Sequence, residues 1–336
     1  MKTGWQNAGL VALLLCLLLG AGLLSLGVGS AQIPPHKVLA ALVGKTGQDA
    51  VTTIVCDIRL PRLVLAVLVG AALAVAGAAM QGFFQNPMAD PYIVGVSSGA
   101  ALGATLGMVL RINFWIAGLS AIPIFAFAGA LGATFLVYAL SIRGGRVPVA
   151  LLLLVGVALG ALTSAATSLV MLAGNEDTRL ILFWLLGSLS SRHWGHVRMI
   201  LPYVLLGISI IWLHARDLNL LLLGEETAQH TGVDVERVKR IILAAAALLA
   251  AAAVSVSGII GFVGLIVPHL MRLIIGPDHR RLIPMSALTG ALLIVLADVL
   301  ARTIAAPSEI PIGIITSALG CPFFLLLIAR RNDIAF

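Results

Sequence analysis

The sequence has 336 residues, of which 60% are hydrophobic and only 10% charged, with a formal net charge of +7. A soluble globular protein carries roughly 25% charged residues because its hydrated surface needs them, so the composition argues against a soluble enzyme and a classical nucleic-acid-binding protein. Lys and Arg stand singly or in pairs at the ends of apolar segments. This distribution is typical of charges that orient helices in a membrane, and not of a nucleic-acid surface.

Apolar segments follow one another along the chain, separated by short polar or Pro- and Gly-containing stretches, and they predict ten transmembrane helices. Segments this continuous favour helices, because the strands of a membrane barrel would alternate polar and apolar residues. We therefore expect an all-α polytopic membrane protein with a single transmembrane domain over residues 1–336. The ten predicted helices are 8–29, 61–84, 92–110, 114–140, 148–172, 198–215, 239–257, 259–275, 284–304 and 311–329.

The ten segments place both termini on the same side of the membrane, which we predict to be the cytoplasm. Basic residues are only slightly more numerous on this side, among them Lys2 and Arg331, so the positive-inside bias is weak. The first apolar segment is too long for the core of a signal peptide and is interpreted as a span. An odd number of spans or the opposite orientation would place the highly charged segment 216–240 less sensibly.

Two small patterns in the chain resemble catalytic or packing motifs. Gly95–Gly99 matches the G-x-S-x-G turn of serine hydrolases, but that turn joins a strand to a helix, and here it enters an apolar helix. The glycines Gly99, Gly103 and Gly107 are four residues apart, a spacing that lets helix backbones approach closely, either within one subunit or between two copies. The histidines and the three cysteines show no metal-ligand or disulfide spacing.

Charged residues inside the predicted helices are few. Asp298 and Arg302 stand four residues apart on one helix, so they lie on one face and could pair, with Glu309 close by in the sequence. A proton-driven carrier usually has buried acids or histidines in several helices. The energy source is therefore expected to lie outside this chain, which has no phosphate-binding loop of the P-loop type.

The segment Gly224–Arg237 is a candidate contact for such an external energy source. Acidic residues stand where a short helix would begin, and Gly232 is expected to break that helix and to be followed by a second short one. Two short helices at the inner surface would form a lever on which another protein can push. A solvated connecting loop is the alternative that spacing alone leaves open.

The chain resembles the FecCD family of permease subunits, which serve ABC importers for ferric siderophores, haem and cobalamin. The resemblance extends in order over essentially the whole chain, with Cys321 as a minor departure where the family often has a small residue. The residues that carry it are 81–91, 95–100, 258–272, 276–281, 309–316 and 320–324.

The resemblance implies a permease of the type II ABC importer fold in the plasma (inner) membrane. The subunit would pair with a second copy of itself around a central pathway and would bind two cytoplasmic ATPase subunits and a periplasmic or lipid-anchored binding protein. It would have no catalytic site and no cofactor, because ATP and Mg would bind to the ATPase. A ferric siderophore is the favoured cargo, with haem and cobalamin as alternatives. A self-sufficient secondary carrier or channel is the competing interpretation.

The resemblance also implies roles for particular residues. Three arginines on the outer side would meet acidic residues of the binding protein, five residues would form the ATPase contact, and five would line the pathway. The docking residues are Arg59, Arg62 and Arg302; the ATPase-coupling residues are Glu225, Glu226, Ala228, Gly232 and Val233; the pathway residues are Met80, Gln81, Ser164, Thr167 and Ser168.

Overall fold

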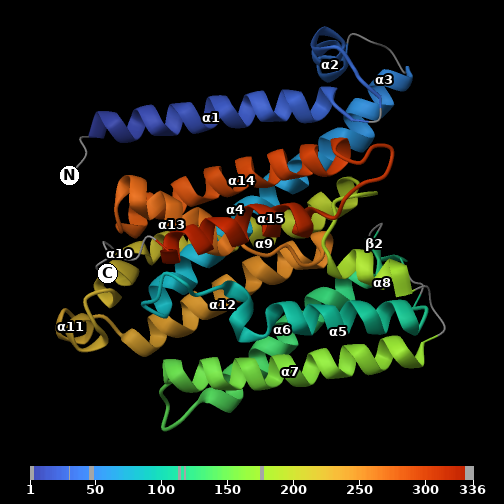
Figure 1. The fold of residues 1–336 in the computed structure, drawn as a ribbon. Helices are drawn as coiled ribbons and strands as arrows, with labels where there is room; N and C mark the ends of the chain where they lie inside the picture. The colour runs from blue at the N-terminus through green and yellow to red at the C-terminus, as the bar shows by residue number, and fades with distance from the viewer. Residues whose placement is uncertain are drawn as a thin grey trace.

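The computed structural model is a bundle of long helices that lie roughly side by side (Figure 1). The described residues are 4–29, 31–44, 49–112, 115–116, 119–174 and 178–329. Lys2 and Arg331, which entered the orientation argument, lie outside them.

The long helices correspond one by one to the ten apolar segments of the sequence. Seven of them are long and apolar enough to cross a membrane among the described residues, and α5, α13 and α15 are shorter apolar helices. These ten helices are α1 (Gly4–Gly27), α4 (Leu60–Phe83), α5 (Val96–Val109), α6 (Ala121–Ser141), α7 (Val149–Ala173), α9 (Trp194–Leu213), α12 (Val235–Ser257), α13 (Val263–Ile275), α14 (His279–Thr303) and α15 (Ile312–Ala329).

Short elements connect the long helices. The short helices among them cannot span a bilayer, because a transmembrane helix needs about 20 residues. The short elements are α2 (Pro35–Leu42), α3 (Ala50–Thr52), the π-helical turn η1 (Thr53–Arg59), the 3-10 turn η2 (Pro91–Val94), the paired strands β1 (Trp115–Ile116) and β2 (Leu119–Ser120), α8 (Thr178–Leu185), α10 (Ala215–Leu221) and α11 (Glu225–His230).

Two sequence-based expectations about boundaries are wrong. The helix expected over 114–140 begins only at Ala121, because Trp115–Ile116 and Leu119–Ser120 pair as a small antiparallel hairpin. The second short helix expected after Gly232 is instead the start of the long helix α12. Asp234 caps this helix by accepting a hydrogen bond from the Arg237 backbone, and nothing in the apolar sequence that follows interrupts it.

Helix α4 lies at the centre of the packing, where α12, α13 and α14 all contact it. Glycines make this close approach possible. A Cβ atom at Gly70 would overlap the Gly290 carbonyl group of α14, and one at Gly77 would overlap the Gly264 backbone of α13. Small residues are common at helix contacts in membranes. The hydrophobic effect does not drive helices together in lipid, so close van der Waals contact has to stabilise their association.

The glycine series Gly99, Gly103 and Gly107 has the same function within the chain. Gly99 of α5 abuts the Gly129 backbone of α6, and Gly103 abuts the Phe125 carbonyl group of the same helix. This series packs helices of one subunit together, as one of the two sequence interpretations expected.

The two faces of the bundle perpendicular to the helices differ in their short elements (Figure 1). One face carries the start of α1, the end of α15, and the short helices α10 and α11. Helices α2, α3 and α8 lie on the opposite face. At the edge of the bundle, α7 leaves most of its surface exposed, including Leu154, Val157 and Leu172. Such an apolar surface needs a lipid or protein neighbour.

Replacing Gly77 with Ala is expected to destabilise the protein by about 1–3 kcal/mol, because the new methyl group meets rigid backbone of α13. Gly132→Ala is the matched control: Gly132 lies inside α6, and a methyl group added there would have no other atom within 4 Å. There Ala is expected to be neutral or stabilising by about 0.5–1 kcal/mol, since it is the better helix former. The measurement is the thermal unfolding midpoint of each variant in detergent, and equal midpoints would contradict the packing argument.

Candidate functional site

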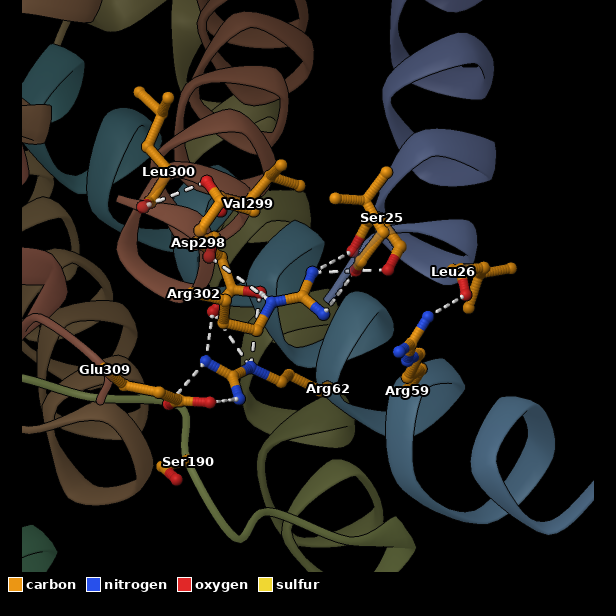
Figure 2. A network of polar contacts seen from close by, with 12 residues as sticks. Ser25, Leu26, Arg59, Arg62, Ser190, Asp298, Val299, Leu300, Arg302 and Glu309 are labelled. Atoms are coloured by element: carbon orange, nitrogen blue, oxygen red, sulfur yellow. Dashed lines mark hydrogen bonds and ion pairs between the residues drawn. The ribbon is translucent and has the colours of Figure 1, made fainter. Parts of the chain in front are cut away.

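A buried polar network joins α4 to α14 near the face that carries α2 and α3 (Figure 2). Arg62, in the first turn of α4, donates from Nε to Asp298 Oδ1 at 2.9 Å, and its Nη2 lies 2.8 Å from the same oxygen. Its two terminal nitrogens donate to the two oxygens of Glu309 at 2.8 and 3.0 Å. The single guanidinium group therefore holds two carboxylates with paired, charge-assisted hydrogen bonds.

Arg302 contacts the same Asp298 carboxylate from one turn further along α14. Its Nε lies 3.1 Å from Asp298 Oδ2, so the pair that the four-residue spacing allows is formed. The Arg302 Nη2 donates to Ser25 Oγ at 2.9 Å and Nη1 donates to the Val28 carbonyl at 3.2 Å. Asp298, which is fully buried, thus bridges two arginines, and Arg302 ties the end of α1 to α14.

Arg59 completes the group through backbone carbonyls. It donates to the Leu26 carbonyl at 2.7 Å and to the Ala31 carbonyl at 2.5 Å, both at the end of α1 and the stretch that follows it. The Leu26 carbonyl is free to accept because the last carbonyls of a helix have no partner within it, and Ala31 lies beyond the end of α1. The three arginines together fasten α1, α4 and α14 to one another.

Arg59, Arg62 and Arg302 are 6%, 8% and 8% exposed in this chain. Each guanidinium group of the three predicted docking residues therefore already has partners inside the chain. The physical reason is that a charge near the apolar core is costly unless it is paired and hydrogen-bonded. Contact of these residues with a binding protein stays a prediction.

Two loop residues beside this network have shifted pKa values. Burial raises the pKa of Glu309, but the hydrogen bonds and positive charge of Arg62 outweigh it and hold that pKa below its usual value. Burial, together with the nearby charge of Arg62, lowers the pKa of Arg192 to about 10. Arg192 follows α8, far from Arg62 in the sequence, and sequence analysis missed it because no spacing pattern connects the two.

The predicted coupling segment is attached to the bundle by an ion pair. Lys239 of α12, only 3% exposed, lies 2.5 Å from Glu225 at the start of α11 and 3.8 Å from Glu236. Sequence analysis missed Lys239, because fourteen positions along the chain separate it from Glu225 and no local pattern links them. The exposed residues of α11 include Glu226 and Gln229.

The end of α11 is fixed by a Schellman motif. The Val233 amide donates to the Ala228 carbonyl at 3.1 Å and the Gly232 amide donates to the Gln229 carbonyl at 2.9 Å. Gly232 has a φ of +90°, in the region that favours glycine, as a bend at this residue requires. The Ala228 side chain is fully buried within the chain, so the expectation that it touches an ATPase groove is corrected.

The predicted pathway residues fall into two groups. Met80 and Gln81 are buried, at 0% and 2% exposure. The Gln81 amide donates to the Gly264 and Leu265 carbonyls at 3.2 Å, and its oxygen accepts from Arg272 at 2.9 Å. Within one chain Met80 is therefore fully buried and Gln81 joins α4 to α13, and their contribution to a pathway stays a prediction.

The other pathway candidates lie on α7. Ser164 and Ser168 are exposed, whereas Thr167 is 6% exposed. The Ser168 hydroxyl donates to the Ser164 carbonyl at 3.1 Å, and the Thr167 hydroxyl donates to the Thr163 carbonyl at 2.8 Å. Hydroxyls bonded to their own helix are compatible with an apolar environment. Ser164 and Ser168 thus remain on a free surface of the chain, and their contribution to a pathway stays a prediction.

The long apolar helices define a multi-pass membrane protein. The model of the FecCD transport family matches residues 16–330, and the chain belongs to this family. The family and its permease character agree with the resemblance seen in the sequence motifs.

Relatives and a solved structure cover most of the chain. The chain is 50% identical to the cobalamin import system permease protein BtuC of Halobacterium salinarum, over 84% of this chain and 75% of that protein. It is 44% identical to the hemin transport system permease protein HmuU of Yersinia pestis, over 93% and 94%. A solved ABC transporter assigned to the metal-chelate type, in an inward-facing conformation, has a TM-score of 0.83 and 32% identity, covering 98% of this chain and 100% of that one.

Asp298→Asn is expected to lower the free energy of unfolding by about 3–5 kcal/mol, because the change leaves two buried guanidinium groups without their shared negative charge. Asp57→Asn, at an exposed position of η1, is the control and is expected to change stability by less than about 0.5 kcal/mol. Thermal unfolding of the purified variants in detergent checks this. An Asp298→Asn protein as stable as the control would contradict a structural role for the carboxylate.

Proposed function

We propose that this chain is the membrane-spanning permease subunit of an ATP-driven ABC importer that moves a metal chelate into the cytoplasm. Membership of the FecCD transport family supports this proposal, as do relatives named for cobalamin and hemin transport. The structural observation that carries it is α11, a short polar helix fixed to the bundle at both ends and presented beside α10 on one face.

The fixed attachment of α11 suits it to transmit force. The Glu225–Lys239 pair fastens its start to α12, and the Schellman motif around Gly232 fixes its end directly before α12 begins. A push on the exposed surface, where Glu226 lies, would therefore reach α12 without being lost in a loose loop. A bound ATPase changes the balance of two transporter states only if it binds them with different affinity, and α11 is the contact we propose for that difference.

Family membership, and not the placement of titratable groups, supports an external energy source. Asp298 is already paired with two arginines, but His196, His269 and His279 are also buried, on α9, α13 and α14. The match to the FecCD transport family and the relatives named as permeases favour an ATP-driven importer over a secondary carrier.

We propose that two copies pair through the exposed apolar side of α7, so that Ser164 and Ser168 face a shared pathway. The exposed Leu154, Val157 and Leu172 would then lie against the second copy or lipid. The face with α10 and α11 would be cytoplasmic, together with both termini, and the exposed Arg143 and Arg216 would lie on the side that the positive-inside rule favours.

The opposite face is the proposed docking surface for a periplasmic or lipid-anchored binding protein. Acidic residues of that partner would compete with Asp298 and Glu309 for Arg62, or would approach Arg59 and Arg302 at their edges. The permease would contribute no catalytic group and bind no cofactor, because ATP and Mg would be held by two ATPase subunits. Complementary charge would mainly increase the association rate.

Reconstitution tests the proposed function directly. The full chain is placed in liposomes with its ATPase and binding protein, and uptake of a ferric siderophore, hemin and cobalamin is compared. We expect uptake of one of these chelates. This uptake should require added ATP and should stop when the ATPase is left out. Uptake driven by a proton or sodium gradient without the ATPase would support the carrier alternative and contradict the proposal.

Gly232→Val is expected to abolish ATPase co-purification and ATP-driven uptake, because a β-branched residue is strained at a φ of +90° and would unfasten the end of α11. Gly44→Val is the matched control. Gly44 also follows the end of a short helix, has a φ of +73° and has nothing within 4 Å of an added Cβ, but lies on the α2 side. Wild-type complex yield and uptake in the Gly232→Val protein would remove α11 as the coupling element.

A further inference from the structure

A groove of about 360 Å³ opens between α6 and α12, away from the arginine network and from α11. One wall comes from the second half of α6 and the other from the first half of α12. The lining includes Leu131, Phe135 and Tyr138 on α6 and Arg240, Ala244 and Ala247 on α12.

Most of the groove is apolar and open to the surroundings of the bundle. Phe135 is 67% exposed, and Ala244 is also exposed. From Tyr138 to Leu131, and in parallel from Arg240 to Ala247, seven helical residues give a length of about 10 Å along the bundle. These dimensions suit an extended hydrocarbon chain lying along the helices.

One end of the groove is polar. The Arg240 guanidinium group is exposed, and its Nε donates to the Glu236 carbonyl at 3.3 Å, which keeps the side chain beside its own helix. Tyr138 lies on the opposite wall. The Val147 amide donates to Glu236 Oε2 at 3.1 Å, so the turn between α6 and α7 meets the start of α12 at this level. The polar end therefore lies at the edge of the bundle and the apolar part runs inward.

Further arginines surround this polar end. Arg143 and Arg146 lie in the turn after α6, Arg237 lies in the first turn of α12, and all three are exposed. Within the described residues, none of these arginines nor Arg240 has an ion pair with a carboxylate. The nearby Glu236 is already used by Lys239 and the Val147 amide. Even with Asp234 at the start of α12 counted, the corner carries net positive charge beside an apolar groove.

We propose that this groove binds an anionic phospholipid, with one acyl chain along α6 and α12 and the phosphate at Arg240. Guanidinium groups match phosphate oxygens in geometry as well as charge, and a tyrosine at the water–membrane boundary is a further usual neighbour of lipid headgroups. Basic pockets between membrane helices on the cytoplasmic side are suited to acidic headgroups. The side assignment rests on the proposed function, whereas the site itself requires only that the bundle spans a membrane.

The charge pattern favours this occupant over the others that an apolar groove could take. A zwitterionic lipid would gain the same hydrocarbon contact but would present a cationic group to four arginines. A second copy of this chain would bring the same arginines, and like charges would meet. An anionic headgroup complements the corner and leaves the helix packing unchanged.

The test uses the purified full-length chain in detergent, titrated with dioleoyl phosphatidylglycerol or dioleoyl phosphatidylcholine and followed by native mass spectrometry. The wild-type protein is expected to retain phosphatidylglycerol in preference to phosphatidylcholine. Arg240→Gln is expected to weaken phosphatidylglycerol binding about fivefold and to leave phosphatidylcholine binding unchanged, as removal of one basic residue near a membrane surface implies. Ala244→Phe fills the apolar wall and is expected to reduce binding of both lipids.

Two matched variants control for charge and bulk. Arg216→Gln removes an exposed arginine on α10, and Ala128→Phe adds the same bulk at an exposed position of α6 outside the groove lining. Both are expected to bind each lipid as the wild-type protein does. Equal binding of the two lipids by the wild-type protein would overturn the proposal, as would an Arg240→Gln protein that matches Arg216→Gln. Loss of a dimer in Ala244→Phe, with lipid binding retained, would assign the groove to a second copy and also overturn it.

Discussion

The shared carboxylate of Asp298 is the contact that holds together α1, α4 and α14 at the end of the bundle that carries α2 and α3. It lies in a fully buried position between the guanidinium groups of Arg62 and Arg302, and through them it connects α4, α14 and the end of α1 (Figure 2). An unpaired charge here would have neither water nor a counter-ion, so the members of the network hold one another in place. Their positions are therefore set by the chain itself before any partner approaches.

The absence of water inside a membrane also explains how the other helices pack. Helices in lipid gain little stability from burying apolar side chains against one another. Around α4 the helices are instead held by close backbone contact at glycines such as Gly70 and Gly77. Helix α7 packs on α5, α6 and η2 through one side, where Gly156 abuts the Ile93 carbonyl group, and keeps an apolar surface free on the other. The bundle thus combines a closely packed centre with an edge suited to a neighbour, which is the division that a transport pathway between two copies would require.

Much of the architecture could be predicted from the sequence, because continuous apolar segments leave little choice but membrane helices. The Asp298–Arg302 pair followed from a spacing of four residues. The partners of Arg62 and Arg59 did not, because Asp298, Glu309 and the carbonyls of α1 are brought to them only by tertiary packing. For the same reason the sequence does not reveal that Gln81 bonds to backbone carbonyls and Arg272 of α13. A charged residue near a span end has the same local pattern whether its partner is internal or external.

The central claim is that Arg62 and Asp298 stabilise this chain as an interacting pair, whatever else docks beside them. A double-mutant cycle of Arg62→Gln and Asp298→Asn, measured by unfolding of the purified protein in detergent, tests the claim most directly. The account predicts that each single variant is destabilised and that the double variant loses at least about 1.5 kcal/mol less than the sum of the two losses. Strictly additive losses, or an Arg62→Gln protein of wild-type stability, would contradict it and leave Arg62 free to act on a partner alone.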